Sequence, residues 1–98
     1  SASSLTPEID TYDIFEFTAL AEALTINNHS TSTPANGEMM EFIFKDNGTA
    51  RGLTWGDKYV AGGVALPTTT VTSKVTRVLV QWHSTNGKWH CITSITEA

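Results

Sequence analysis

The sequence predicts a single small all-β domain, and three observations support this. Apolar residues recur at every second position over 40–45 and 77–83, which is the period of a half-buried strand. Each run is followed by an Asn-Gly dipeptide, at 47–48 and 86–87, and such dipeptides favour hairpin turns because both turn residues need a positive φ. Charged residues make up 16% of the chain, against about 25% in a typical domain, and Thr, Ser and Asn take their place.

Length and composition narrow the possible functions. The 98 residues are 40% hydrophobic, which suits one folded domain with one core. The net charge of -4 argues against a nucleic-acid or anionic-membrane binder, which needs a basic surface. No apolar stretch approaches the ~20 residues of a membrane span. The single cysteine, Cys91, leaves no internal disulfide or cysteine-rich zinc site, so we expect a half-buried thiol and no cofactor.

The N-terminal third of the chain divides into an arm, two strands and a loop. Residues 1–11 are predicted to be a flexible arm, because they are Ser-rich and contain Thr6-Pro7; residues 12–98 are the predicted β-domain. Aromatic and β-branched residues over 12–18 indicate a strand. The stretch 19–24 has good helix propensity but is short, so a strand–turn–strand arrangement over 12–26 is favoured and a helical turn is the alternative. Residues 29–37 form a predicted loop.

The segment 39–55 is the first predicted hairpin. A two-residue turn at Asn47-Gly48 places Phe42 opposite Leu53 and Met40 opposite Trp55. This register agrees with the apolar pattern. It puts five residues on one face: Met40, Phe42, Phe44, Leu53 and Trp55.

The rest of the chain contains a loose segment and the second predicted hairpin. Gly62-Gly63 marks a bend, and residues 68–72 fit an exposed edge or connecting strand. In the hairpin over 75–96, a two-residue turn at Asn86-Gly87 sets Trp82 opposite Cys91. The residues expected to face inward are Val78, Val80, Trp82, Cys91 and Ile95. With about six to eight short strands in all, we expect a small antiparallel β-sandwich or barrel, jelly-roll-like, with two Asn-Gly hairpins.

The same register makes His83 and His90 cross-strand neighbours. Two imidazoles there suit zinc binding or pH sensing. A metal site needs a third ligand, and none occurs at a telling spacing, so we interpret the pair as two surface histidines and assign no metal. His29 is too remote in sequence to place.

Aromatic residues supply the other candidates for contacts. Trp55 and Trp82 are expected in the core, whereas Trp89, beside the turn, is expected to be partly exposed and available to a partner together with Tyr59. Asp46-Asn47-Gly48 resembles a fragment of a calcium loop but lacks its further oxygens and distal Glu, so the turn explains it. No paired acid–base residues or nucleophile motif can be placed, and we expect no enzymatic activity.

Two strings of residues carry a family resemblance. The segment 42–55, which contains Lys-Asp-Asn-Gly-Thr-Ala-Arg, and the segment 63–70, which contains Ala-Leu-Pro-Thr-Thr-Thr, are similar to a β-domain of tailed-bacteriophage virion structural proteins. The closing residues 80–82 and 88–89 resemble it too. The similarity runs from about Tyr12 to Ile95, and His83, His90 and Cys91 are not part of its pattern.

The resemblance implies a structural role on the exterior of a virion, assembled in the host cytoplasm. The favoured form is a capsid decoration protein or a subunit of a head or tail appendage such as a fibre. The implied partners are other virion proteins and copies of the chain itself, with a trimer as one option, and no nucleic acid or membrane. The predicted contact residues are Ser1, Ser3 and Leu5 of the arm, with Trp89 and Tyr59. The alternative is a carbohydrate- or receptor-binding module of a fibre tip for a host glycan; a depolymerase enzyme ranks third.

Overall fold

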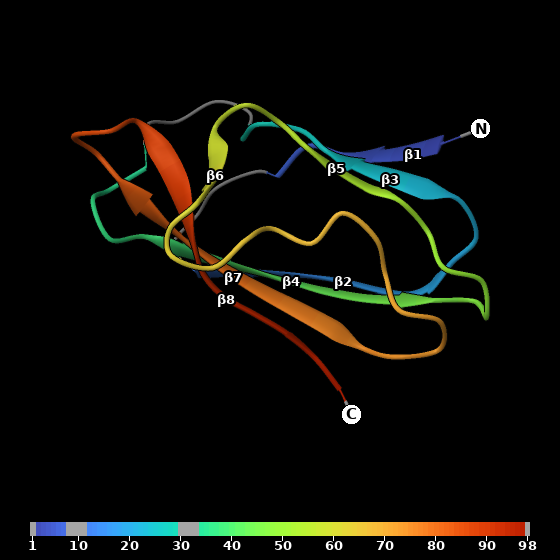
Figure 1. Cartoon of the computed structure of the whole chain (residues 1–98). Helices are drawn as coiled ribbons and strands as arrows, with labels where there is room; N and C mark the ends of the chain where they lie inside the picture. The colour runs from blue at the N-terminus through green and yellow to red at the C-terminus, as the bar shows by residue number, and fades with distance from the viewer. Residues whose placement is uncertain (1, 8–11, 30–33, 98) are drawn as a thin grey trace.

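The computed structural model describes residues 2–7, 12–29 and 34–97 (Figure 1). Within these ranges the chain forms strands and no helix, which confirms the all-β prediction. The helical turn considered for 19–24 is wrong, because one strand ends at Leu20 and the next begins at Ala23. The strands are β1 (Ala2–Leu5), β2 (Tyr12–Leu20), β3 (Ala23–Ile26), β4 (Met39–Asp46), β5 (Leu53–Trp55), β6 (Tyr59–Ala61), β7 (Thr76–His83) and β8 (Lys88–Thr96).

The strands form two open sheets and no closed barrel. One sheet has three strands in the order β1-β3-β5, and the other has five in the order β2-β4-β7-β8-β6. Figure 1 shows the three-stranded sheet above β2, β4 and β7 of the five-stranded one. Successive strands from β1 to β5 alternate between the two sheets, so the chain winds from one sheet to the other and back.

This winding makes most strand pairs parallel, and the antiparallel part of the prediction is wrong. Four of the six pairs, β1 with β3, β3 with β5, β2 with β4 and β6 with β8, are parallel. Only β4 with β7 and β7 with β8 are antiparallel among the described strands. When the chain leaves one sheet, forms a strand in the other sheet and returns, the new strand runs in the same direction as the earlier strand of that sheet. The two strands therefore pair in parallel.

The first predicted hairpin is wrong, although its apolar face is right. β4 and β5 lie in different sheets, and Phe42 pairs with Val78 of β7 instead of Leu53. The turn after β4 carries the chain across the core, and Phe42 meets Trp55 edge-on, with ring centroids 5.4 Å apart. A period-2 pattern states only which side of a strand is apolar, and facing strands of two sheets satisfy it as well as neighbours in one sheet do.

The second hairpin is confirmed, with a different turn and register. β7 and β8 are antiparallel, and His83 pairs with Lys88, so the connection has four residues, 84–87, instead of two. The backbone N–H of Gly87 donates to the His83 carbonyl across this turn. The shift of two positions keeps inward residues inward as far as Cys91.

A bulge in β8 overturns one inward prediction. The register shifts between Leu79 and Val80, which pair with Thr93 and Cys91, so Ile92 is the additional residue. The bulge reverses the alternation beyond it. Ile95, predicted to face inward, therefore lies opposite Arg77 and is 57% exposed.

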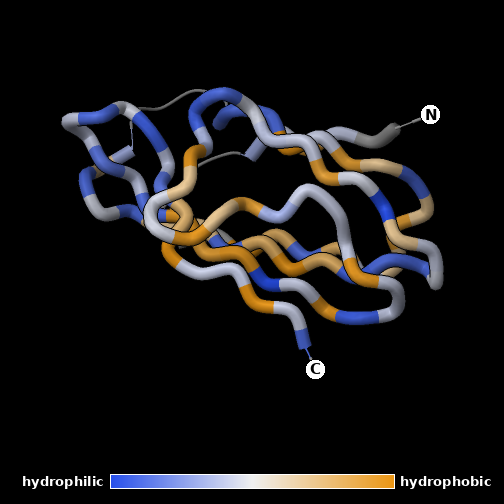
Figure 2. The backbone as a smooth tube through the Cα atoms, viewed as in Figure 1, coloured by the Kyte–Doolittle hydropathy of each residue, from blue (hydrophilic) through white to orange (hydrophobic). Residues whose placement is uncertain are grey.

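Both sheets contribute to one core. Leu24, Ile26 and Leu53 enter it from the three-stranded sheet, and the alternate residues of β4, β7 and β8 enter from the other. Figure 2 shows the corresponding change between hydrophobic and hydrophilic positions along the strands. The fully buried members with the largest side chains are Trp89, Phe42, Phe44, Leu24 and Ile26.

The N-terminal segment is part of a sheet, which corrects the prediction of an arm over Ala2–Leu5. These residues pair in parallel with Ala23–Ile26, and the Leu5 carbonyl accepts the N–H of Asn27. Leu5 is half-buried against the core and Pro7 is buried. Residues 1 and 8–11 of the predicted arm lie outside the described residues.

Candidate functional site

The His83–His90 pair is on one outer face, as predicted, but as a diagonal pair. Gln81 is the residue opposite His90, and the two imidazole centroids are 5.3 Å apart with their planes inclined by 51°. His90 Nε2 lies 3.2 Å from the side-chain nitrogen of Asn86. No group of three or more His, Cys, Asp or Glu side chains gathers for a metal within the described part of the chain.

Trp89 and Tyr59, predicted as exposed contact residues, are core residues. Trp89 is 0% exposed and Tyr59 is 5% exposed. Trp89 pairs with Trp82 across the hairpin and packs against its ring at 5.3 Å, because the four-residue turn shifts it away from Ser84. The Tyr59 hydroxyl donates to the Asn27 carbonyl, and burial raises the pKa of the phenol well above its usual range. Neither side chain is available to stack on a ligand.

His29 is a titratable side chain whose surroundings could not be predicted from the sequence. It follows β3 and packs edge-on against Trp82 and Trp89, with centroid separations of 5.2 and 6.0 Å. The Trp89 indole N–H donates to His29 Nδ1 over 3.1 Å, so Nδ1 carries no proton in this arrangement. Partial burial, with a contribution from the Lys58 charge, lowers the pKa of His29 below 6.5. Sixty residues separate the partners, and no local pattern signals the contact.

Asp46 connects the segment 42–55 with the segment 63–70. Its carboxylate is buried and accepts the hydroxyl of Thr70 at 2.7 Å and the backbone N–H groups of Ser73 and Gly48 at 2.8 and 3.0 Å. The Thr70 hydroxyl in turn accepts the N–H of Arg51. The hydrogen bond from Ser73, followed by that from Thr70, lowers the pKa of Asp46. Three protein donors bond to this carboxylate, so it stabilises the turn after β4.

The outer face of the five-stranded sheet mixes aliphatic and charged side chains. One row across the strands contains Glu16, Ile43, Arg77 and Ile95, in that order. Arg77 Nη1 lies 3.5 Å from the carboxylate of Glu41 in the adjacent row. The large hydrophobic residues exposed on this face are Ile14 at 55%, Ile92 at 41% and Ile95 at 57%.

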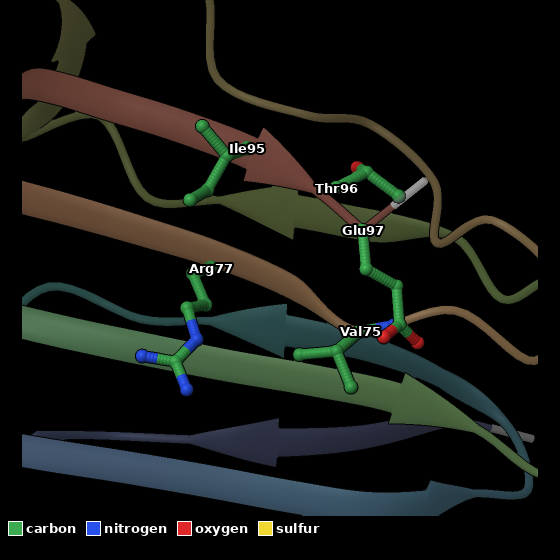
Figure 3. A pocket seen from close by; sticks show the side chains of 5 residues that line it. All are labelled: Val75, Arg77, Ile95, Thr96 and Glu97. Atoms are coloured by element: carbon green, nitrogen blue, oxygen red, sulfur yellow. The ribbon is translucent and has the colours of Figure 1, made fainter.

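Hollows on this face are shallow. Figure 3 shows one at the end of the β7–β8 pair, where Arg77, Ile95 and Glu97 lie around a space of about 220 Å³ that is open to solvent. The hollow beside His83 and His90 has about 230 Å³. Small-molecule pockets usually have roughly 300–1,000 Å³ and enclose most of the ligand. Both hollows are therefore smaller than such a pocket.

The other residues considered in the sequence analysis, three predicted contact residues of the N-terminal segment and the single cysteine, lie in different surroundings. Ser1 lies outside the described residues, and Ser3 is in β1, where it pairs with Leu24. Leu5 lies partly buried at the end of the core. Cys91 is buried, and desolvation raises the pKa of its thiol, which is the opposite of what a catalytic thiolate needs.

No family model, no curated protein and no solved structure matches the chain. Among the described residues, no helix has the length and apolar character that crossing a membrane requires. Any functional assignment therefore rests on the residues and contacts described above.

Proposed function

We propose that this chain is a structural subunit on the exterior of a tailed-bacteriophage virion, either a capsid decoration protein or part of a head or tail appendage. We further infer that its two sheets form an open sandwich. The chain contacts other virion proteins in this role and performs no chemical reaction.

The single observation that carries the proposal is the hydrogen-bonded cluster around Asp46. The two strings that resemble the virion β-domain meet where Arg51 and Asp46 each bond to Thr70, which lies 19 and 24 positions further along the chain. Residues that buttress a buried turn belong to a pattern that specifies a fold. The resemblance is thus concentrated on the parts of the chain that determine its architecture, as expected for a domain shared among structural proteins.

The outer surface supports the same proposal. Exposed isoleucines and shallow hollows on the five-stranded sheet are suited to contacts with proteins. The glycan-binding alternative depended on Trp89 and Tyr59, and both are buried. No observation on the described residues favours that alternative over a structural role.

Analysis of purified particles tests the proposal. Virions of the phage that encodes this chain are purified by density gradient, and their proteins are identified and quantified by mass spectrometry. We expect peptides of this chain at a fixed ratio to the major capsid or tail protein. Immunogold electron microscopy with antibodies against the folded chain then distinguishes a head location from a tail location. Absence of the chain from infectious particles would exclude the proposal.

A further inference from the structure

The four edge strands of the two sheets, β1, β5, β2 and β6, differ in how far their outer sides are covered. The outer side of β5 is covered, because Leu53 N–H donates to the Thr68 carbonyl and Thr70 N–H donates to the Arg51 carbonyl. β6, at one end of the other sheet, has only three residues. β1 and β2 end their sheets with no strand on their outer sides among the described strands. These two edges present the backbone donors and acceptors that an additional strand needs.

The two open edges lie on the same side of the molecule. Two residues connect β2 to β3, and β4 connects to β5 at the same end of the core. The order β1-β3-β5 in one sheet therefore runs in the same direction as the order β2-β4 in the other. β1 must then lie over the border that β2 forms. Figure 3 shows this arrangement, with β1 and β2, the two blue ribbons, together at the lower border.

The core is incompletely covered at this border. Phe15 and Phe17 of β2 stack on Phe42 and Phe44 of β4, with centroid separations of 5.6 and 6.0 Å. The two β2 rings are partly buried, whereas the β4 rings are fully buried. Leu5 of β1 is also half-buried. At this border, therefore, the edge strands β1 and β2 have backbone groups without a strand partner, and the rings of Phe15 and Phe17 are incompletely covered.

β2 contains two acidic residues and an irregularity between Phe17 and Leu20, but the described residues of this border include no Lys and no covering strand. Soluble proteins usually protect edge strands with Lys or Pro, with very short strands or with a covering segment. β2 has nine residues and β1 has four, and neither contains Lys, Arg or Pro. Edges left in this state are suited to strand pairing with another chain.

We propose that the β1–β2 border is a dimer interface, and that its occupant is a second copy of this chain related by a two-fold axis normal to the sheets. Such an axis pairs β1 with β1 and β2 with β2 of the copy, both antiparallel, in one contact. A single extended peptide covers only one of the two edges, because packed sheets lie about 10 Å apart. Only a body with two matching edges fills the border, and a second copy has them.

The side chains of β2 are compatible with this pairing. In an antiparallel register centred on Phe15, this ring meets its own counterpart, and Ile14 lies opposite Glu16 of the copy. The two Glu16 carboxylates are not directly opposite each other, which avoids the most unfavourable cross-strand pair. The pairing also covers the exposed side of Phe15.

Concentration-dependent measurements on the full chain test the dimer and locate it. Analytical ultracentrifugation should show a monomer–dimer equilibrium, with dimer predominating at about 100 μM. Hydrogen–deuterium exchange on the same samples should show slower exchange in β1 and β2 as the dimer forms, with no change in β6. A monomer throughout this range, a trimer, or new protection confined to other strands would overturn the proposal.

A matched pair of variants separates the border from the rest of the same sheet face. Ile14→Glu adds a carboxylate to each side of the seam, close to Glu16, and should raise the dimer dissociation constant by about tenfold or more at low salt, with partial recovery in high salt. Ile95→Glu introduces the same side chain at an equally exposed position on β8 and should leave dimerisation unchanged. Equal effects of the two variants would contradict the location. The inference stands on the strand arrangement alone, so particle composition and self-association are separate results.

Discussion

The positions of Trp89 and Ile95 provide the sharpest test of the fold, because the simple hairpin register and the structure assign them in opposite ways. In the structure Trp89 is 0% exposed, packs against Trp82 and donates its indole N–H to His29. Trp89→Phe keeps an aromatic ring but removes that hydrogen bond, which is worth about 0.5–1.5 kcal/mol. It also leaves unfilled volume, so the total loss should be about 2 kcal/mol of unfolding free energy. For a domain of roughly 100 residues this lowers Tm by about 8–16 °C.

Ile95→Ala is the control, since this side chain is 57% exposed beyond the bulge. Its expected cost is within about 0.5 kcal/mol, as for other surface substitutions. Both variants are measured by urea and thermal unfolding followed by circular dichroism, with the m-value compared to the parent protein. If Ile95→Ala costs more than Trp89→Phe, the bulge and the four-residue turn are wrong.

Three further predictions concern titratable groups. The pKa of His29 is lowered in the folded chain, so stability should be greatest above pH 6.5 and fall as the pH drops below that value; His29→Gln should flatten this dependence in urea titrations at pH 5–7. The pKa of Asp46 is also lowered, so its contribution should persist above pH 3.8 and disappear as the pH falls further, and Asp46→Ala, which removes the acceptor of Thr70 and Ser73, should lower the urea midpoint at pH 7. An unchanged midpoint would show that this cluster does not support the turn. Cys91, buried and with a raised pKa, should react with Ellman's reagent far more slowly in the native protein than in urea, and a native thiol that reacts at the unfolded rate would contradict its burial.

Local signals in the sequence were sufficient for the strands and for most of the core. Alternation identified Met40, Phe42 and Phe44 as one face of a strand, and all three are fully buried. The chain bends at both Asn-Gly dipeptides, but of their residues only Gly48 and Gly87 have a positive φ, so neither dipeptide forms the predicted turn in which both residues have one. These features depend on neighbours within a few residues, which is the range over which turn chemistry and period-2 patterns act.

Strand partners required the tertiary structure. The same turn signal precedes a return within one sheet at Gly87 and a crossing to the other sheet at Gly48. The crossing at Gly48 is set by Asp46, because its hydrogen bonds reach Thr70 and Ser73, more than twenty residues away. No local pattern contains those distant donors, so the hairpin prediction failed there.

By itself the sequence determined that this protein is a small all-β domain with one apolar side to each long strand, because alternation and turn chemistry are local properties of the chain. Only the tertiary structure decided that the early strands wind between two sheets and pair in parallel. It also decided that Trp89 lies inside, Ile95 lies outside and His29 caps the tryptophan pair. Those outcomes depend on a bulge, a turn length and contacts across sixty residues, where packing of the whole core chooses among arrangements that the sequence pattern allows equally.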